Sequence, residues 1–450
     1  PRARAEGPLT LEQVVERARQ NDLRVKEADA ELRLLEGRYT EARWAWFPKF
    51  ETTVLAGGPT PEARNNGLGG PPTNPGGFLY DLNFGDPGFT TRLEITALLP
   101  LFTFGKLRAL REAGRQGVAV GKDLKSRSQN EAAYQAAQAF FGYQLARQSR
   151  QSLADTRNRL EEANTLLKKL LEQDSAQVAQ SDLNKLEFYR QQAEALAPRS
   201  EAGINLALAA VRVLLSIPPG QPVELASADL KEPELELKPV DFYLALAADH
   251  RPEFSAIRHG VAAREQEVLI RQRQFFPDFG IGGLFRFAYT SNTTRQRSPF
   301  AYDPYNSLNS GVGLVARASF DVPVKLAKLE QARAELDKLK VQESLLQSGV
   351  RLEVQKIYGD LNTALLRAKA LSVGERNARR WFTAAYANFE LGTTDTRELT
   401  ESLIALAQVS GEKLQSWHDV SLGLYALARA TGTDEARGSR VPNANETLNR

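Results

Sequence analysis

The 450-residue sequence predicts a mixed α/β fold that is mainly helical and is built from two copies of one structural half. Three observations predict it: an order of segments that recurs in each half, very long stretches without proline, and four short segments of alternating polarity. A repeat that takes up almost half of a chain indicates a duplicated fold, since solenoid units span only about 20–50 residues.

Each predicted copy begins with an amphipathic helix that ends in an aromatic–proline sequence, Trp46–Pro48 in the first copy and Phe275–Pro277 in the second. A strand, a loop, a second strand and a long helix follow in both copies. We therefore divide the chain into an N-terminal segment (1–8), a first repeat (9–220, with a hairpin at about 49–100), a connector (221–239), a second repeat (240–432, with a hairpin at about 278–323), and a polar tail expected to be disordered (433–450).

Two predicted helices are too long for a globular domain. One follows Pro100 and runs to about Leu171, and its twin follows Pro323 and runs to about Leu391. At 1.5 Å per residue, such helices would be roughly 100 Å long. Apolar residues recur in them with a spacing of seven, which predicts left-handed coiled-coil packing. These residues are Leu153, Leu160 and Leu167 in the first helix, and Ala332, Leu339 and Leu346 in the second.

The four alternating segments have one apolar face and one polar face. In the third segment, the apolar face consists of Phe279, Ile281, Gly283, Phe285, Phe287 and Tyr289. This pattern is typical of a transmembrane β-strand with lipid on one side and water on the other, although a soluble sheet packed on a helix has it too. Four strands cannot close a barrel, and open sheet edges are not viable in lipid. If these strands span a membrane, several copies must share one barrel.

Composition excludes several classes of function. Acidic and basic residues are finely mixed, with a formal net charge of +3, so no nucleic-acid partner is expected. Cysteine is absent, and His250, His259 and His418 lack metal-ligand spacing. We find no phosphate-binding loop and no nucleophile elbow, and we expect neither an enzyme nor a cofactor. The chain contains no methionine and begins at Pro1, so we expect that a leader has been removed.

From about residue 9 to residue 432, the chain resembles the TolC family of outer-membrane efflux channels. The resemblance lies in the order of several short motifs: Leu9–Glu12, the two aromatic–proline sequences, Pro100–Gly105, Phe140–Gly142 and Ile357–Gly359. It implies a homotrimer that pools four strands per subunit into a 12-stranded transmembrane β-barrel, continued by a coiled-coil α-helical tunnel. The resemblance also implies the outer membrane of a Gram-negative bacterium, with a large periplasmic part.

The resemblance further implies an exit duct of a tripartite efflux or type I secretion system, which passes small molecules or polypeptides. Its partners would be outer-membrane lipid, a periplasmic adaptor (membrane fusion) protein and an inner-membrane pump. Two alternatives stay open at this point: a soluble coiled-coil scaffold, and a non-conducting outer-membrane anchor of the same fold.

In this family, the long helices turn at two periplasmic tips, which the resemblance places at 176–183 and 391–401. The first tip has Ala176 where the family usually has glycine, whereas the second keeps its glycine. The resemblance implies that five residues contact the adaptor: Ser181, Asp182, Gly392, Thr393 and Thr394.

The resemblance also places a gate of acidic residues at Glu398 and Glu401. Residues three apart share one helix face, so a three-fold axis would stack them into two carboxylate rings that attract cations. The alternative is that both are ordinary solvated charges. The resemblance implies a latch between the tips in which the family often uses an arginine. Thr394 occupies that place here, so we expect Arg397 or another basic residue to form the latch to Asp182.

Overall fold

The computed structural model describes residues 7–57, 89–173, 178–218, 220–226, 229–291 and 306–437. Most of the two predicted hairpin loops, Ala176 at the first tip and the end of the polar tail lie outside these residues. Within the described residues, no helix is both long enough and apolar enough to cross a membrane.

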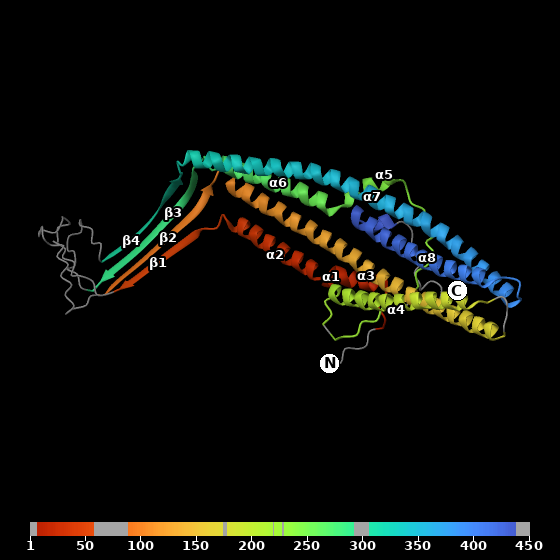
Figure 1. Ribbon diagram of the computed structural model, residues 1–450. Coiled ribbons are helices and arrows are strands. Elements are labelled where there is room, and N and C mark those ends of the chain that lie inside the picture. Colours follow the sequence, from red (N-terminus) through yellow and green to blue (C-terminus); the bar gives the residue numbers. More distant parts are fainter. Residues whose placement is uncertain are drawn as a thin grey trace, which may run out of the picture. The chain divides into compact units, whose positions relative to one another are not determined.

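The predicted duplication is visible element by element (Figure 1). The first copy consists of α1 (Leu11–Asn21), α2 (Leu23–Trp44), β1 (Lys49–Gly57), β2 (Thr90–Phe102), α3 (Lys106–Glu172) and α4 (Gln180–Leu214). The second copy consists of α5 (Val240–His250), α6 (Pro252–Arg273), β3 (Asp278–Thr290), β4 (Ser307–Arg317), α7 (Val322–Glu390) and α8 (Thr396–Thr431), followed by the short 3-10 helix η1 (Asp434–Arg437).

Corresponding helices have nearly equal lengths in the two copies. The entry helices have 11 and 22 residues in both. The long helices α3 and α7 have 67 and 69 residues, and the return helices α4 and α8 have 35 and 36. The chain also forms two compact units, one of Pro1–Leu34, Ala119–His259 and Lys340–Arg450, and one of Leu35–Val118 and Gly260–Leu339.

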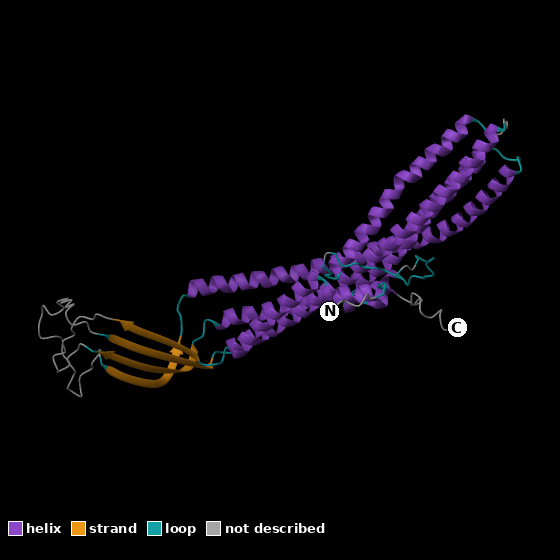
Figure 2. Ribbon diagram, turned by 90° about the horizontal axis from the view of Figure 1, so that it is seen from below, coloured by secondary structure: helices purple, strands orange, loops and turns teal. Residues whose placement is uncertain are grey.

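The four strands form one antiparallel sheet in the order β1-β2-β3-β4, drawn in orange in Figure 2. The central β2–β3 pair joins the two copies, with Leu93 opposite Phe287 and Glu94 opposite Arg286. The two charged side chains also form an ion pair at 3.2 Å. Because paired residues point to the same face, this register aligns the apolar residues of all four strands.

Strand β4 is shorter than the sequence predicted. It ends at Arg317, and the alternating residues Ala318 and Phe320 lie beyond it. Helix α7 begins instead at Val322, directly before Pro323. Proline has no N–H to donate and a φ angle suited to a first helical turn, so it favours the start of the helix at this point.

Three clusters of buried residues hold the helices of the first unit together. One involves α1, α3 and α4 of the first copy, and a second involves α5, α7 and α8 of the second copy. The third cluster lies near the tips and contains Leu160, Leu167, Leu186, Phe389 and Leu403. Two of the leucines that were predicted to form a heptad seam are therefore buried, as coiled-coil packing requires.

A network of ion pairs also links the two copies. Arg251, which separates α5 from α6 and is only 11% exposed, lies 2.7 Å from Glu353 on α7 and 3.2 Å from Glu253. Arg429 on α8 binds the same Glu353 at 3.0 Å and Glu131 on α3 at 3.2 Å. Burial opposes the charge of Arg251, but the two glutamates outweigh it and raise the pKa of Arg251 above its ordinary value.

Each return helix ends against the break between the two entry helices of its own copy. In the first copy, Ser216 has a φ of 54° and donates its hydroxyl to the carbonyl of Asn21 at 2.7 Å. In the second copy, Gly432 has a φ of 79°, and an added Cβ would lie 2.5 Å from the carbonyl oxygen of His250. The two copies thus share a left-handed backbone turn, but only the second has no space for a side chain.

We therefore expect Gly432→Ala to destabilise the protein by at least about 2 kcal/mol, because it adds both a steric clash and a strained φ angle. The check is the thermal unfolding midpoint of the purified protein in detergent. Gly411→Ala on the same helix is the matched control, because its Cβ would meet nothing within 4 Å. Equal midpoints for the two variants would contradict the close approach of Gly432 to His250.

Candidate functional site

One face of the sheet is apolar and exposed in the single chain. Val312 and Leu314 on β4 are 82% and 87% exposed, and Phe50 and Val54 on β1 lie on the same face at 63% and 64%. The opposite face bears charged and polar side chains. Among these are Lys49, Glu51, Arg92, Glu94, Arg286 and Asn309. Such large apolar exposure indicates a contact with lipid or with another protein surface.

The two edges of the sheet are open. Within the described residues, β1 pairs only with β2, and β4 pairs only with β3. Their outer N–H and C=O groups therefore need partners, and in an apolar environment each unpaired group costs several kcal/mol. The single chain is incomplete at both edges.

Aromatic side chains gather where helices meet strands. After α2, the rings of Trp44 and Trp46 stack with centroids 6.0 Å apart. After α6, Phe276 stacks on Phe104 at 4.8 Å. Trp44 and Trp46 are about half exposed, as is Phe276. Aromatic residues at the end of an apolar strand surface are typical of a membrane–water interface.

The second tip has a well-defined turn. Helix α7 ends in a Schellman motif, in which Gly392 has a φ of 75° and donates to the carbonyl of Phe389 at 3.0 Å. Thr393 donates its N–H to the carbonyl of Asn388 at 2.9 Å. Asp395 then caps α8 by accepting from the N–H of Glu398 at 3.0 Å. The glycine that the sequence pointed to is thus the left-handed residue that this turn requires.

At the first tip, the described chain resumes just before α4. The carboxylate of Asp182 accepts from the N–H of Ala179 at 3.0 Å, and the N–H of Asp182 donates back to the carbonyl of Ala179 at 2.9 Å. Asp182 therefore stabilises the N-terminus of α4, where a negative charge is favourable. Ser181 beside it is exposed.

The two predicted gate residues, Glu398 and Glu401, lie in the first turns of α8 and are both exposed. The structure gives each a partner from its own chain. Arg397 donates to the carboxylate of Glu401 at 2.7 Å, and the indole N–H of Trp381 on α7 donates to Glu398 at 3.4 Å. The predicted latch between Arg397 and Asp182 stays a prediction, because the described contacts of these two side chains are with Glu401 and Ala179.

Sequence reasoning missed two contributors to the second tip. The cap at Asp395 had a signal, since an Asp three residues before a Glu is typical of a helix start. The contact of Trp381 had none, because Trp381 lies 17 residues from Glu398 on the other helix of the tip hairpin.

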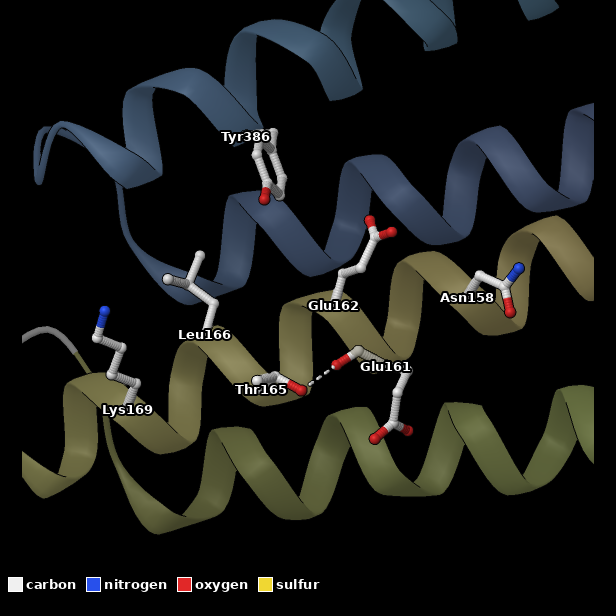
Figure 3. Close-up of a pocket in the computed structure, with 7 residues that line it drawn as sticks. All are labelled: Asn158, Glu161, Glu162, Thr165, Leu166, Lys169 and Tyr386. Atoms are coloured by element: carbon white, nitrogen blue, oxygen red, sulfur yellow. Dashed lines mark hydrogen bonds between the residues drawn. The ribbon is translucent and has the colours of Figure 1, made fainter.

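An open groove of about 620 Å³ lies on the long helices near the tips (Figure 3). Its lining residues are Asn158, Glu161, Glu162, Thr165, Leu166 and Lys169 of α3, and Tyr386 of α7. Figure 3 shows Glu162 on α3 and Tyr386 on α7, two of the residues that line this groove. Burial, together with Glu390 and Glu162, raises the pKa of Tyr386. Within the described residues, no group of acidic and histidine side chains could hold a metal ion.

The profile of the outer membrane efflux protein family matches residues 14–207 and 243–433, so the chain belongs to this family. The two matched segments correspond closely to the two structural copies. No curated protein sequence matches the chain significantly.

Solved structures of outer-membrane channels share the fold. The channel OprN matches with a TM-score of 0.75 at 19% identity, over 94% of this chain and 89% of its own. VceC of Vibrio cholerae matches with a TM-score of 0.72 at 16% identity, over 94% and 96% of the two chains. MtrE of Neisseria gonorrhoeae matches with a TM-score of 0.71 at 15% identity, over 96% and 90%.

Family membership assigns the chain to the outer membrane, as an efflux duct with a large periplasmic part. Proteins of this family are channels and not enzymes, which confirms the prediction from the sequence. The soluble scaffold that the sequence left open does not fit an outer-membrane protein.

The apolar sheet face gives a direct test of membrane contact. We expect Leu314→Arg to reduce the amount of folded protein in the outer membrane, because an arginine near the bilayer midplane costs about 2–4 kcal/mol on a lipid-facing strand. The measurement is the yield of protease-resistant protein in the outer-membrane fraction. Thr53→Arg is the matched control, because Thr53 lies on the polar face opposite Glu94. A similar loss for both variants would argue against lipid contact on the apolar face.

Proposed function

We propose that three copies of this chain assemble into one transmembrane barrel and one helical tunnel, and that the assembly conducts solutes across the outer membrane. The observation behind this proposal is the four-stranded sheet with an exposed apolar face and two open edges. Pairing β4 of one copy with β1 of the next would give every edge a partner and every apolar face a contact with lipid.

We further propose that the duct works in a tripartite efflux or type I secretion system, with a periplasmic adaptor protein and an inner-membrane pump. The residues that we expect at the adaptor surface lie at the two tips. Gly392 and Thr393 are exposed and belong to a hydrogen-bonded turn, and Ser181 and Asp182 lie in the first turn of α4. The pump would select among small molecules and polypeptides, and the duct would pass what the pump delivers.

We also propose that Glu398 and Glu401 form the periplasmic gate. Both lie on the exposed side of α8, while Leu399 and Leu403 on its other side are buried in the tip cluster. Three copies around an axis would therefore present two levels of carboxylates to the lumen. Like charges held close together repel one another and attract cations.

Purified protein in a planar lipid bilayer tests the channel. We expect discrete, stable conductance steps from the detergent-solubilised trimer, because a closed barrel continued by a hollow tunnel gives water a continuous path. Chemical cross-linking of the same preparation should yield a trimer. A trimer that inserts but never conducts would instead favour the non-conducting anchor.

The same measurement tests the gate. We expect the Glu398→Ala/Glu401→Ala double variant to conduct more than the wild type and to lose block by Mg²⁺, because repulsion between carboxylates and their affinity for cations disappear together. Unchanged conductance and unchanged Mg²⁺ block would show that Glu398 and Glu401 do not form the gate. The proposal that the protein is a channel would be unaffected.

A further inference from the structure

The two acidic residues of the proposed gate differ in the charge of their partners. We propose that Arg397 is the resident counter-charge of Glu401, so that Glu398 alone sets the affinity of the gate for cations. The inference rests on the gate proposed above and adds a positioning and selectivity role for Arg397.

The contact between Arg397 and Glu401 is a direct ion pair within one helix. Its Nε–Oε1 distance is 2.7 Å, and the two residues are four apart on α8. The side chains are 76% and 46% exposed, so the pair lies on the same open side of the helix as Glu398. The carboxylates of Glu401 and Asp395 raise the pKa of Arg397 further, and arginine keeps its proton in any case.

The partner of Glu398 is neutral. The indole N–H of Trp381 lies 3.4 Å from its carboxylate and orients the side chain without compensating its charge. A cation in the lumen would therefore meet a full carboxylate at Glu398 and a neutralised pair at Glu401.

The turn before α8 fixes this arrangement. The Schellman motif at Gly392 and the cap at Asp395 set where α8 begins, and Arg397 is the second residue of the helix. The spacing of four residues then places its guanidinium over Glu401. The geometry of the pair comes from the start of the helix and needs no contact from the first tip.

Block of the purified channel by Mg²⁺ in planar bilayers tests the inference, with the half-blocking concentration as the readout. We expect Glu398→Gln to raise this concentration at least about tenfold and Glu401→Gln to change it less than about twofold, because only Glu398 presents an uncompensated charge. Arg397→Gln should lower the half-blocking concentration severalfold, because it removes the counter-charge of Glu401. The double variant Arg397→Gln/Glu401→Gln should return to the wild-type value.

Two controls sharpen the test. Arg190→Gln removes a partly buried arginine that is paired with Glu187 at 2.7 Å on α4, and it should leave the block unchanged. Asp182→Asn tests the predicted latch. If it reproduces the effect of Arg397→Gln, then Arg397 acts as a latch and the counter-charge inference is wrong.

Two further outcomes would overturn the inference. Equal effects of Glu398→Gln and Glu401→Gln would show that both carboxylates bind cations alike. Block that no substitution at either glutamate changes would remove the gate proposal, and the counter-charge with it. Each variant should first show wild-type trimer formation and measurable conductance, so that a folding defect is not mistaken for a change in block.

Discussion

The open edges of the four-stranded sheet are the constraint on which the rest of this structure depends. A strand edge in lipid must find hydrogen-bond partners. The described part of one chain supplies three strand pairings, of which β2–β3 joins the two copies, and leaves both outer edges open. The apolar face of the sheet also needs a partner that water does not provide, because large side chains such as Leu314 are almost fully exposed on it. Sheet edges and sheet face therefore both point to an assembly in a membrane.

The two copies have the same arrangement of helices, but different buried side chains stabilise each of them. The first copy has an alanine-rich cluster around Ala132, Ala136 and Phe140, whereas the second has larger residues such as Val354 and Leu361. The ion-pair network around Arg251 and Arg429 connects helices from both copies. Duplication supplied equivalent elements, and a small number of specific contacts joins them.

The periodic parts of this fold could be predicted from the sequence. Alternation predicted the sheet faces, and the spacing of Leu160 and Leu167 predicted a buried seam, because both patterns are local consequences of backbone geometry. The prediction placed the end of β4 too far along the chain, because the alternation of apolar and polar residues continues past Arg317. The strand ends at Arg317, and α7 begins at Val322, directly before Pro323. The partners of the gate residues were harder to predict. Trp381 reaches Glu398 only because a tip turn folds α7 back on α8, and such a contact leaves no periodic signal.

The position of β1 and β4 at the two edges also has a kinetic meaning. Within the described chain, each of these strands has one neighbour, so closure by other copies, as proposed, makes their final hydrogen bonds intermolecular. Folding of the membrane part would then be completed by association, and its rate and apparent stability would depend on the concentration of chains. In the proposed assembly, the last step of folding is therefore a bimolecular reaction between chains, and it obeys mass action.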